Sequence, residues 1–499
     1  MTTHHTPHTD AVPGVDALEA VTLVASPPRE DAQAVGYVVF ADRDVPPALG
    51  LDRAALERAG LSAKVGSTVV IPSATGPDLV AIGAGEAPLS DTAALRDIAA
   101  ALMRAASRSA RLALVVEDVS LPVSDAAAAI AEGAVLARYR YTALKSESTH
   151  TSLDTLTVSL GGDDAAASAG LAAGLRAARA TVIARDVTNA PPGRLTATDM
   201  AAVAVALGER YGFAVEAFDK AALTQMGCGG ILGVNQGSAH EPRMIKLTYT
   251  PADAPTGHLG LVGKGIMYDS GGISLKPSDP MHLLMKMDMG GAAAVLGAMC
   301  VLRDMGATAQ VTGWLMCTDN MPSGGAYKLG DVLVARNGTT VEVKNTDAEG
   351  RLVMMDAIAL ANEEGVDAII DIATLTGAAL MALGQRTAPV FANNDQMAAR
   401  VQDAAAATGE PVWRLPLEPT YRAQLDSDIA DISNLGGKYA GATTAALFLE
   451  HFVGTTPWAH LDIAGTMQTE KDDSWRTAGA TGFGARILAQ VAATFTSVD

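Results

Sequence analysis

The sequence predicts an α/β protein made of two domains, and three observations support this prediction. Short apolar runs with strand character alternate with alanine-rich segments of helical length along most of the chain. The length of 499 residues exceeds what one core usually organises, and a hydrophobic content of 49% is ample for two cores. The sequence GGDD at 161–164 interrupts the alternation before a long alanine-rich segment, which divides the chain into two halves.

The N-terminal domain is expected over residues 18–163. Apolar runs bounded by turn residues predict its strands, and two alanine-rich stretches predict its helices. The expected strands are 21–24, 34–40, 68–72, 79–83, 112–116 and 155–160, and the expected helices are 92–107 and 124–138.

Two segments flank this domain. Residues 1–17 are predicted to be a disordered tail, because the first 15 residues contain His4, His5 and His8 and two prolines but no apolar core. The same composition differs from that of a signal peptide. Residues 164–190 are predicted to form a helix that links the two domains, because two prolines follow and proline cannot continue a helix.

The second domain is expected over residues 191–499 and is also predicted to be α/β. Asn337-Gly338 between two apolar runs indicates a hairpin. The expected strands are 244–248, 258–262, 309–316, 332–335, 341–343, 368–372, 389–391 and 458–463, and the expected helices are 289–304, 350–363, 443–452 and 483–493.

Charge and cysteine content limit the classes of partner. A formal net charge of −19 disfavours binding to nucleic acid or to an anionic membrane surface. No apolar run reaches the length of a membrane span. Cys228, Cys300 and Cys317 are odd in number and lack metal-ligand spacing, so we expect buried thiols in a cytoplasmic protein.

The segment NTDAEGRL at 345–352 contains the first candidate functional residues. Asp347 and Glu349 lie one residue apart before an apolar helical run, and Arg351 follows. Two carboxylates in this arrangement can hold a hard divalent cation. They can equally cap the helix, because acidic side chains at a helix N-terminus complement its dipole. Spacing alone leaves both interpretations open.

A second segment, VGKGIMYDSGGISLK at 262–276, adds further candidates. We expect a glycine-rich loop after the strand at 258–262, carrying Lys264, Asp269 and Lys276. Asp288 opens the run DMGGAAA, where it could be a helix cap or another ligand. Together with Asp347 and Glu349, these acids supply four negative charges, which two divalent ions would balance. Oxygen ligands suit Mn²⁺ or Mg²⁺, and Zn²⁺ also accepts them.

Taken together, the motifs KGxxxDSGGISxK, DMGGAA and NTDAEGRL resemble the leucyl aminopeptidase family, the two-metal exopeptidases classified as M17. The sequences DIATLTGA at 371–378 and WAHLDIAG at 458–465 extend the resemblance, which covers roughly residues 180–499. One spacing departs from the family pattern. Lys276 and Asp288 are twelve positions apart, one more than expected, and the extra residue falls within 281–287.

The resemblance implies a C-terminal catalytic domain with a central mixed sheet and two metal ions. It assigns Lys264, Asp269, Asp288 and Glu349 to one ion and Asp269, Asp347 and Glu349 to the other. Asp269 and Glu349 would then bridge ions about 3.5–4 Å apart. The ions would be Mn²⁺ or Zn²⁺, with Mg²⁺ or Co²⁺ as alternatives.

The resemblance also assigns roles in the reaction. Lys276 would donate to the scissile carbonyl oxygen, and Arg351 would hold a bicarbonate ion that relays protons. Substrates would be peptides with a free N-terminus and a leucine or other apolar first residue, and the protein would form a homohexamer. The first side chain of the substrate would lie against Met285 or Met287, Thr374, Gly377 and Ala464.

Other residues and other functions have simpler interpretations. His460 is expected to be a hydrogen-bonded core histidine, with Asp462 anchoring it or a loop amide. Asp428, Asp431 and Asn434 could line an active-site loop or form turns. The sequence DSGG at 269–272 is superficially similar to the nucleophile loop of trypsin-like serine proteases. If the N-terminal half instead bound a nucleotide, GAG at 83–85 would have to contact the phosphates.

Overall fold

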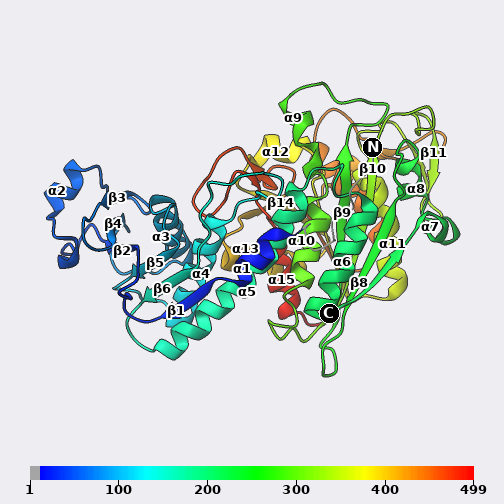
Figure 1. Ribbon diagram of the computed structural model, residues 1–499. Helices are drawn as coiled ribbons and strands as arrows, with labels where there is room; N and C mark the ends of the chain where they lie inside the picture. Colours follow the sequence, from blue (N-terminus) through cyan, green and yellow to red (C-terminus); the bar gives the residue numbers. More distant parts are fainter. Residues whose placement is uncertain (1–11, 499) are drawn as a thin grey trace. The chain divides into compact units, whose positions relative to one another are not determined.

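The computed structural model describes residues 12–498 and divides into two compact units (Figure 1). The N-terminal unit comprises Pro13–Val182 and Thr469–Ala478, and the C-terminal unit comprises Val12 and the described residues of Ile183–Gln468 and Gly479–Asp499. The segment 469–478 belongs to the N-terminal unit, although it lies inside the range expected for the second domain. The ion pair between Arg104 and Asp472, 2.7 Å from Nη1 to Oδ2, holds it to the N-terminal unit.

The N-terminal unit contains a six-stranded sheet in the order β1-β6-β5-β2-β4-β3. All neighbouring strands are parallel except β3 and β4, which are antiparallel. The six expected strands are confirmed, with ends that shift by at most one residue. They are β1 Thr22–Ala25, β2 Ala34–Val39, β3 Thr68–Ile71, β4 Asp78–Gly83, β5 Arg111–Val115 and β6 Thr155–Ser159.

Alanine-rich helices accompany this sheet, and glycines let their backbones approach closely. A Cβ on Gly133 would lie 2.2 Å from Arg96 O, and one on Gly174 would lie 2.2 Å from Ala128 O. Side chains larger than hydrogen therefore cannot occupy these positions without moving a helix. The helices are α1 Pro13–Glu19, η2 Pro47–Leu49, α2 Arg53–Arg58, α3 Thr92–Ala105, α4 Val123–Arg138 and α5 Asp164–Asn189.

Helix α1 corrects one expectation. The disordered tail predicted over 1–17 is wrong for residues 13–17, which belong to this helix. Val15 and Leu18 are buried, so burial of apolar surface rather than helix propensity alone accounts for the order. His4, His5 and His8 lie outside the described residues.

The C-terminal unit is built on an eight-stranded mixed sheet in the order β15-β14-β17-β13-β9-β10-β8-β7. Its four central strands, β17, β13, β9 and β10, are mutually parallel. Their carboxyl ends therefore lie along one edge, where α/β proteins commonly place their sites. The strands are β7 Ala214–Phe218, β8 Arg243–Tyr249, β9 His258–Asp269, β10 Gln310–Asn320, β13 Ala368–Ala373, β14 Ala388–Ala392, β15 Val412–Arg414 and β17 Trp458–Asp462.

Strand β9 is much longer than predicted. The expectation of a glycine-rich loop from residue 263 is wrong, because the strand continues to Asp269. Its glycines serve close packing rather than a turn. A Cβ on Gly263 would lie 2.7 Å from Ala292 Cα, and one on Gly265 would lie 2.7 Å from Met316 O. The extended strand carries Lys264 and Asp269 within one rigid element.

Two smaller sheets complete the strands. β11 and β12 form the antiparallel hairpin predicted at Asn337-Gly338, where Gly338 has a φ of 89°. β16 pairs in parallel with β12. The elements are β11 Val332–Val334, β12 Thr340–Glu342 and β16 Ile432–Ser433, and a two-stranded sheet of β18 Gln468–Thr469 and β19 Gly479–Ala480.

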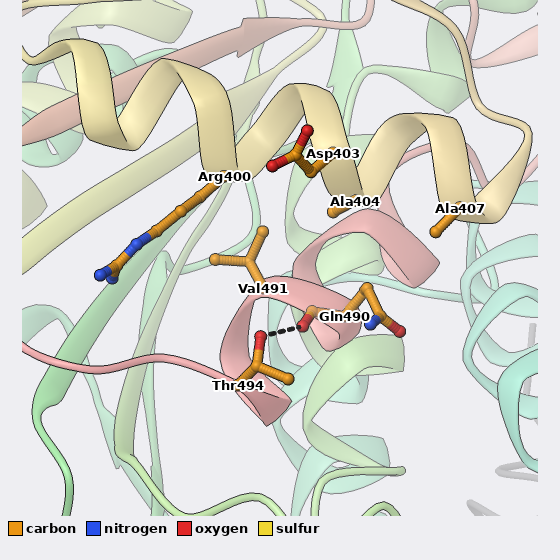
Figure 2. Close-up of a pocket in the computed structure, with 7 residues that line it drawn as sticks. All are labelled: Arg400, Asp403, Ala404, Ala407, Gln490, Val491 and Thr494. Carbon is orange, nitrogen blue, oxygen red and sulfur yellow. Dashed lines mark hydrogen bonds between the residues drawn. The ribbon is translucent and has the colours of Figure 1, made fainter.

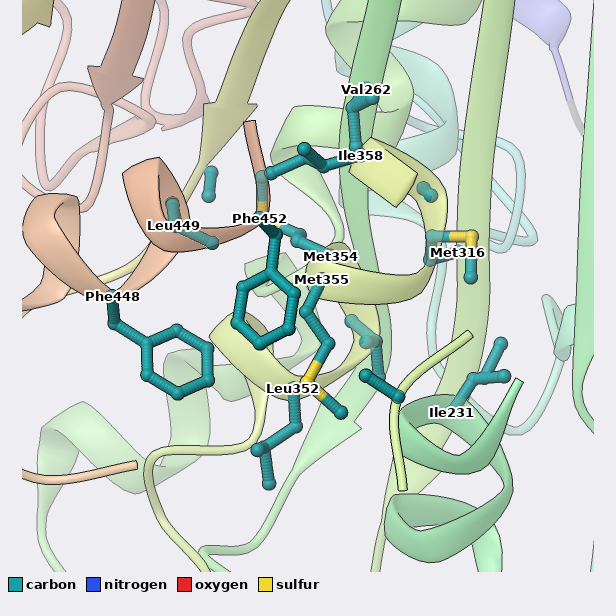
Figure 3. Close-up of a cluster of buried hydrophobic side chains, with 14 of the residues drawn as sticks. Ile231, Val262, Met316, Leu352, Met354, Met355, Ile358, Phe448, Leu449 and Phe452 are labelled. Carbon is teal, nitrogen blue, oxygen red and sulfur yellow. The ribbon is translucent and has the colours of Figure 1, made fainter. Parts of the chain in front are cut away.

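Helix α11 supplies many of the residues in a large hydrophobic cluster of the C-terminal unit. Its residues Leu352, Met355 and Ile358 are fully buried, and they share a hydrophobic cluster with Val262 of β9 and Phe452 of α14 (Figure 3). Each such side chain contributes about 1.5–3 kcal/mol on burial. This packing fixes the N-terminal end of α11, from which the candidate residues project.

The helices of this unit are α6 Ala197–Tyr211, α7 Lys220–Met226, α8 Gly229–Asn235, α9 Pro280–Leu283, η3 Leu284–Met287, α10 Gly290–Met299, α11 Gly350–Glu364, α12 Gly377–Leu383, α13 Asp395–Thr408, η4 Pro419–Leu425, α14 Gly441–Val453 and α15 Ala485–Ala493. The three cysteines are buried, as predicted. Across residues 12–498, no helix is both long and apolar enough to cross a membrane.

Candidate metal centre

The structure brings all seven predicted site residues to the carboxyl edge of the central sheet. Lys264 and Asp269 belong to β9, and Lys276 lies in the loop that follows this strand. Asp288 lies between η3 and α10, so these short helical turns accommodate the longer spacing from Lys276. The remaining three, Asp347, Glu349 and Arg351, surround the start of α11.

Lys264 joins two of the acids. Its Nζ lies 2.8 Å from Asp288 Oδ2 and 2.9 Å from Glu349 Oε1. It also donates to the main-chain oxygen of Thr374 at 2.8 Å. The amine is buried, so each of its partners replaces a hydrogen bond that water would otherwise supply.

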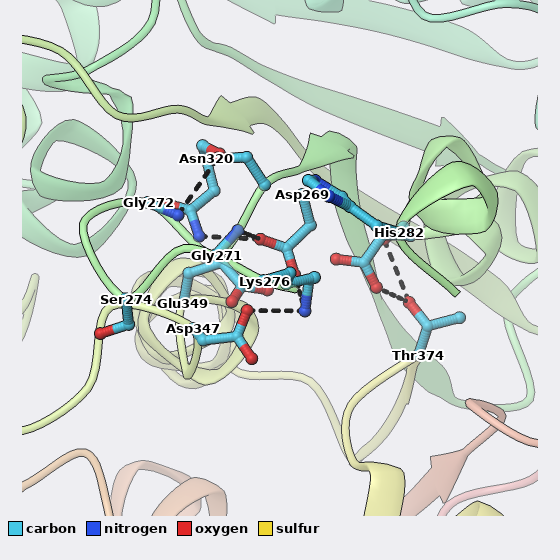
Figure 4. Close-up of polar contacts among 12 residues, drawn as sticks. Asp269, Gly271, Gly272, Ser274, Lys276, His282, Asn320, Asp347, Glu349 and Thr374 are labelled. Carbon is cyan, nitrogen blue, oxygen red and sulfur yellow. Dashed lines mark hydrogen bonds and ion pairs between the residues drawn. The ribbon is translucent and has the colours of Figure 1, made fainter. Parts of the chain in front are cut away.

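Lys276 joins the other two acids. Its Nζ lies 2.8 Å from Asp269 Oδ2 and 2.6 Å from Asp347 Oδ1, and Figure 4 shows it between these carboxylates. Two lysines therefore face four acids, which leaves a surplus of negative charge in a largely buried space.

The carboxylates themselves converge. One oxygen from each of Asp269, Asp347 and Glu349 lies within 4.8 Å of the others, a spacing that a metal ion can bridge. Glu349 Oε2 is buried and has no hydrogen-bond partner within the described structure. A buried carboxylate oxygen without a donor is costly, and coordination to a cation would satisfy it. The donor set thus fits a hard divalent ion.

The pKa values reflect this surplus of negative charge. Burial, followed by the nearby carboxylate of Asp269, raises the pKa of Glu349 to about 8, although Lys264 opposes the shift. Burial likewise raises the pKa of Asp288 to about 6 against the influence of Lys264. For Lys264 itself, burial alone would lower the pKa, but Asp288 and Glu349 outweigh burial and raise it. Acids that resist ionisation beside protonated lysines indicate a site prepared for additional positive charge.

The capping interpretation of these acids is wrong. Glu349 occupies the position before α11, but its carboxylate makes no capping hydrogen bond to that helix. The position before α10 is held by Met289 rather than Asp288, also without a side-chain cap. Asp347 directs its carboxylate to Lys276. The carboxylates therefore pair with the two lysines and do not cap the helices.

Arg351 is buried beside the cluster. Burial lowers its pKa to about 10, while Glu349 and Asp462 oppose this shift. Its Nη1 donates to Asn434 O at 2.9 Å, and its Nε has no hydrogen-bond partner within residues 12–498. A buried guanidinium with an unused donor can hold an anion at this place.

Asn434 is more than a turn former, because it braces the segment that carries Asp347 and its main-chain oxygen accepts from Arg351. Its side-chain oxygen accepts from Lys344 N at 2.8 Å, and its Nδ2 donates to Asn345 O at 2.7 Å. Asp431, in contrast, is a turn residue that accepts from Thr340 N at 2.8 Å. Asp428 lies exposed on the same loop.

His460 and Asp462 follow the simpler interpretation. His460 is fully buried and its Nδ1 hydrogen-bonds to Asp371, which also accepts from Trp458 Nε1. Asp462 accepts from Leu375 N at 3.1 Å and so anchors a loop amide. Among the residues expected to line the substrate, Thr374 reaches the cluster, and its Oγ1 donates to Asp288 Oδ1 at 2.7 Å. The roles of Met285, Met287, Gly377 and Ala464 stay predictions.

Sequence reasoning missed three residues that support the site. Asn320 at the end of β10 donates to Asp269 Oδ1, and Tyr327 donates to Thr346 O at 2.8 Å. Thr346 Oγ1 in turn donates to Gly271 O at 2.7 Å. The sequence offered a signal for Asn320 alone, a polar residue that shortly follows the apolar strand predicted at 309–316.

The rival functions find no support in the geometry. The Ser270 hydroxyl is buried and donates to Asn320 O at 2.7 Å, so it is engaged in structure rather than presented as a nucleophile. In the proposed nucleotide loop, the amides of Gly83, Ala84 and Gly85 all donate to main-chain oxygens of the protein. They are therefore occupied and cannot cradle a phosphate.

A separate cavity of about 360 Å³ lies between α13 and α15 (Figure 2). It shares no residue with the carboxylate cluster and brings only one acid, Asp403, to its wall. It offers no set of converging ligands, so the cluster rather than this cavity is the candidate site. The lining residues are Arg400, Asp403, Ala404, Ala407, Gln490, Val491 and Thr494.

Gly350 provides a direct test of how tightly Lys264 is held. A Cβ at this position would lie 2.6 Å from Lys264 Cε. In Gly350→Ala we expect the lysine tail to bend away from Asp288 and Glu349 at a cost of about 1–3 kcal/mol. Any activity that the site supports should fall about 100-fold, the scale of a 1 Å misplacement in a site. Gly324→Ala is the control, because its Cβ would meet open space. Equal activity of the two variants would contradict the expectation.

Comparisons with known proteins agree with the site. The chain matches the catalytic domain of the cytosol aminopeptidase family over residues 182–489 and the N-terminal domain of that family over residues 50–148. A probable cytosol aminopeptidase of Streptomyces avermitilis is 42% identical, covering 95% of this chain and 98% of the relative. A probable cytosol aminopeptidase of Solibacter usitatus is 40% identical, covering 84% and 88%.

A solved structure shows the same architecture. The bottromycin maturation enzyme BotP in complex with Mn is 38% identical, with a TM-score of 0.84 over 92% of this chain and 98% of the other. The resemblance inferred from the three motifs is therefore confirmed. By sequence, domain content and fold, the chain belongs to the cytosol aminopeptidase family, the metal-dependent M17 peptidases.

Proposed function

We propose that this protein is a leucyl-type aminopeptidase that releases leucine and other apolar N-terminal residues from peptides. The observation that carries the proposal is the convergence of Asp269, Asp347 and Glu349 within 4.8 Å beside two lysines. Such a site suits hydrolysis assisted by metal ions, because the acids and Lys264 can hold the ions while Lys276 remains available to the substrate.

Two divalent ions would be held by the four acids and Lys264. Lys264, Asp269, Asp288 and Glu349 would face one ion, and Asp269, Asp347 and Glu349 the other. Mn²⁺ or Zn²⁺ fits this donor set, with Mg²⁺ or Co²⁺ as alternatives. When bound, the ions supply Lewis-acid chemistry, which acidifies a water and polarises the carbonyl group.

Lys276 and Arg351 would act on the reacting groups. Lys276 is the less buried of the two lysines, with 19% of its side chain exposed against 3% for Lys264. It can therefore turn from Asp269 and Asp347 towards the scissile carbonyl oxygen and stabilise the charge that develops there. Arg351, with its unused Nε, would hold a bicarbonate ion that moves protons between water and the leaving amine.

The setting of the enzyme follows from its relatives. They are named cytosol aminopeptidases, which supports a cytoplasmic location for this chain. The family resemblance further supports a homohexamer acting on peptides with a free N-terminus. We propose both, and size-exclusion chromatography with light scattering would test the assembly.

The free α-amine of the substrate is the feature to test first. A neutral amine can coordinate an ion, whereas an acetylated nitrogen has its lone pair delocalised into an amide. We therefore expect hydrolysis of leucine amide and of leucyl dipeptides but not of their N-acetyl derivatives. Binding through the amine would also present only the first carbonyl to Lys276.

The measurement is kcat/KM for matched free and acetylated substrates with Mn²⁺ present. A panel of aminoacyl amides would establish the side-chain preference in the same experiment. Comparable values for the two substrate forms would refute an aminopeptidase and would indicate an endopeptidase or amidase.

A further inference from the structure

Asn320 connects two parts of the site that lie far apart in the sequence. It is the last residue of β10 and is fully buried. Its Nδ2 donates to Asp269 Oδ1 at 2.8 Å and to Thr346 O at 2.9 Å. Asp269 ends β9, whereas Thr346 precedes Asp347 in the segment before α11. One amide group thus ties together the two segments that carry the converging carboxylates.

The backbone of Asn320 is fixed as firmly as its side chain. Its main-chain oxygen accepts from Ser270 N at 3.0 Å and from Ser270 Oγ at 2.7 Å. A register shift between Thr318 and Asp319 places Asn320 directly opposite Asp269 in the parallel pair of β10 and β9. Bulges of this kind often re-aim a side chain next to an active site.

The arrangement controls how Asp269 presents its carboxylate. Gly271 N also donates to Asp269 Oδ1, at 2.8 Å, so two donors hold one oxygen of this residue (Figure 4). Asp269 Oδ2 is left to face Lys276 and the cluster. A neutral amide suits this place, because a carboxylate in the same position would add a fifth negative charge against Asp269.

We infer that Asn320 is a positioning residue for the metal centre, which it serves without touching substrate or ion. It fixes the rotation of the Asp269 carboxylate and the distance from β9 to the segment at 345–349. This inference rests on the proposed function, since it gives Asn320 the role of presenting ligands to the ions. Partners of metal ligands typically contribute 10- to 100-fold to metal affinity.

The test compares Asn320→Ala with a matched control, Asn235→Ala. Asn235 is also buried, and its Nδ2 likewise donates two bonds, to His240 O at 2.8 Å and Thr318 Oγ1 at 3.0 Å. Neither acceptor belongs to the carboxylate cluster. The Mn²⁺ dissociation constant is measured by chelator competition on the metal-stripped, full-length protein, with circular dichroism to verify folding.

We expect Asn320→Ala to bind Mn²⁺ about 10- to 100-fold more weakly and to regain part of its kcat at high Mn²⁺. Asn235→Ala should keep the wild-type constant while lowering the unfolding temperature. If Asn320→Ala does not fold, Asn320→Ser replaces it, since a serine hydroxyl is too short to reach Asp269 and leaves a smaller void.

Three results would separate the possibilities. A folded Asn320 variant with wild-type Mn²⁺ affinity would overturn the inference while leaving the proposed function intact. An equal loss of affinity in Asn235→Ala would also overturn it, because the effect would then be general to the fold. A wild-type protein that neither binds Mn²⁺ nor hydrolyses leucine amide would overturn the proposed function together with this inference.

Discussion

Replacing Glu349 with alanine is expected to reduce turnover of leucine amide at least about 10⁴-fold, the upper limit for a single proton-transfer residue. Glu349 pairs with Lys264 through Oε1 and keeps Oε2 without a hydrogen-bond donor. Its loss would remove a ligand shared by both proposed ions and leave the buried amine of Lys264 with fewer partners. The site should therefore lose metal as well as activity.

Arg351→Ala is the informative comparison for this variant. Arg351 would only position a proton relay, so its loss should cost about 10²–10⁴-fold in kcat with metal content preserved. Glu349→Gln, which keeps the shape of the side chain, separates loss of charge from loss of packing. Turnover and metal content are measured for all three variants. Near-normal values in Glu349→Ala would show that this acid is not part of the metal centre.

Removal of metal should abolish turnover, and Mn²⁺, Co²⁺ or Mg²⁺ should restore it. Without ions, two lysines face four carboxylates, and the acids respond with raised pKa values. The measurement is activity after chelation and dialysis, with elemental analysis of the protein. Full activity in a protein shown to be metal-free would contradict a two-metal mechanism.

The same electrostatics predict how the metal-free protein responds to pH. The pKa of Glu349 is raised from 4.5 to about 8 and that of Asp288 from 3.8 to about 6. A group whose pKa is higher in the folded than in the unfolded protein stabilises the fold fully at pH values below its unfolded pKa. This stabilisation is lost as the pH rises through the pKa of the folded state. Lys264 and Lys276 also have raised pKa values, but their contribution is lost only above pH 10.

The unfolding temperature of the metal-free protein should therefore fall between pH 5 and pH 8. Mn²⁺ should raise it more at pH 8 than at pH 5, because binding displaces protons at the lower pH. Thermal unfolding at both pH values, with and without Mn²⁺, provides the measurement. A larger stabilisation by Mn²⁺ at pH 5 would contradict the assignment of these acids as ligands.

Much of the fold and the core of the site could be predicted from local sequence. The strands of the N-terminal unit are apolar runs bounded by turn residues, and that pattern placed all six. The candidate site residues lie in three short motifs, and the structure brings them to one edge of the sheet. Strands that end beside one another deliver such motifs to the same place, which is why motif and site agree.

Features that depend on tertiary packing could not be predicted. Strand β7 was missed because it is an edge strand with an exposed pattern and no apolar run. The true length of β9 was hidden, since glycines usually indicate loops and here permit close packing. The pairing of Lys276 with Asp269 and Asp347, and the role of Asn320, depend on which strands are neighbours, and sequence spacing does not contain that information.

The residues of the site are synthesised at different times, because they lie on central strands and loops that are far apart in the sequence. Lys264 and Asp269 emerge from the ribosome near the middle of synthesis, and Glu349 follows some eighty residues later. The oxygen of Thr374 that receives Lys264 comes after β13, and the loop carrying it is anchored by Asp462 at the end of β17. Domains fold as units during synthesis, so a nascent chain shorter than this presents only scattered, hydrated carboxylates. If these residues hold metal ions as proposed, we expect the ions to be captured by the finished C-terminal unit, so that the supply of metal would act on activation of the protein rather than on its synthesis.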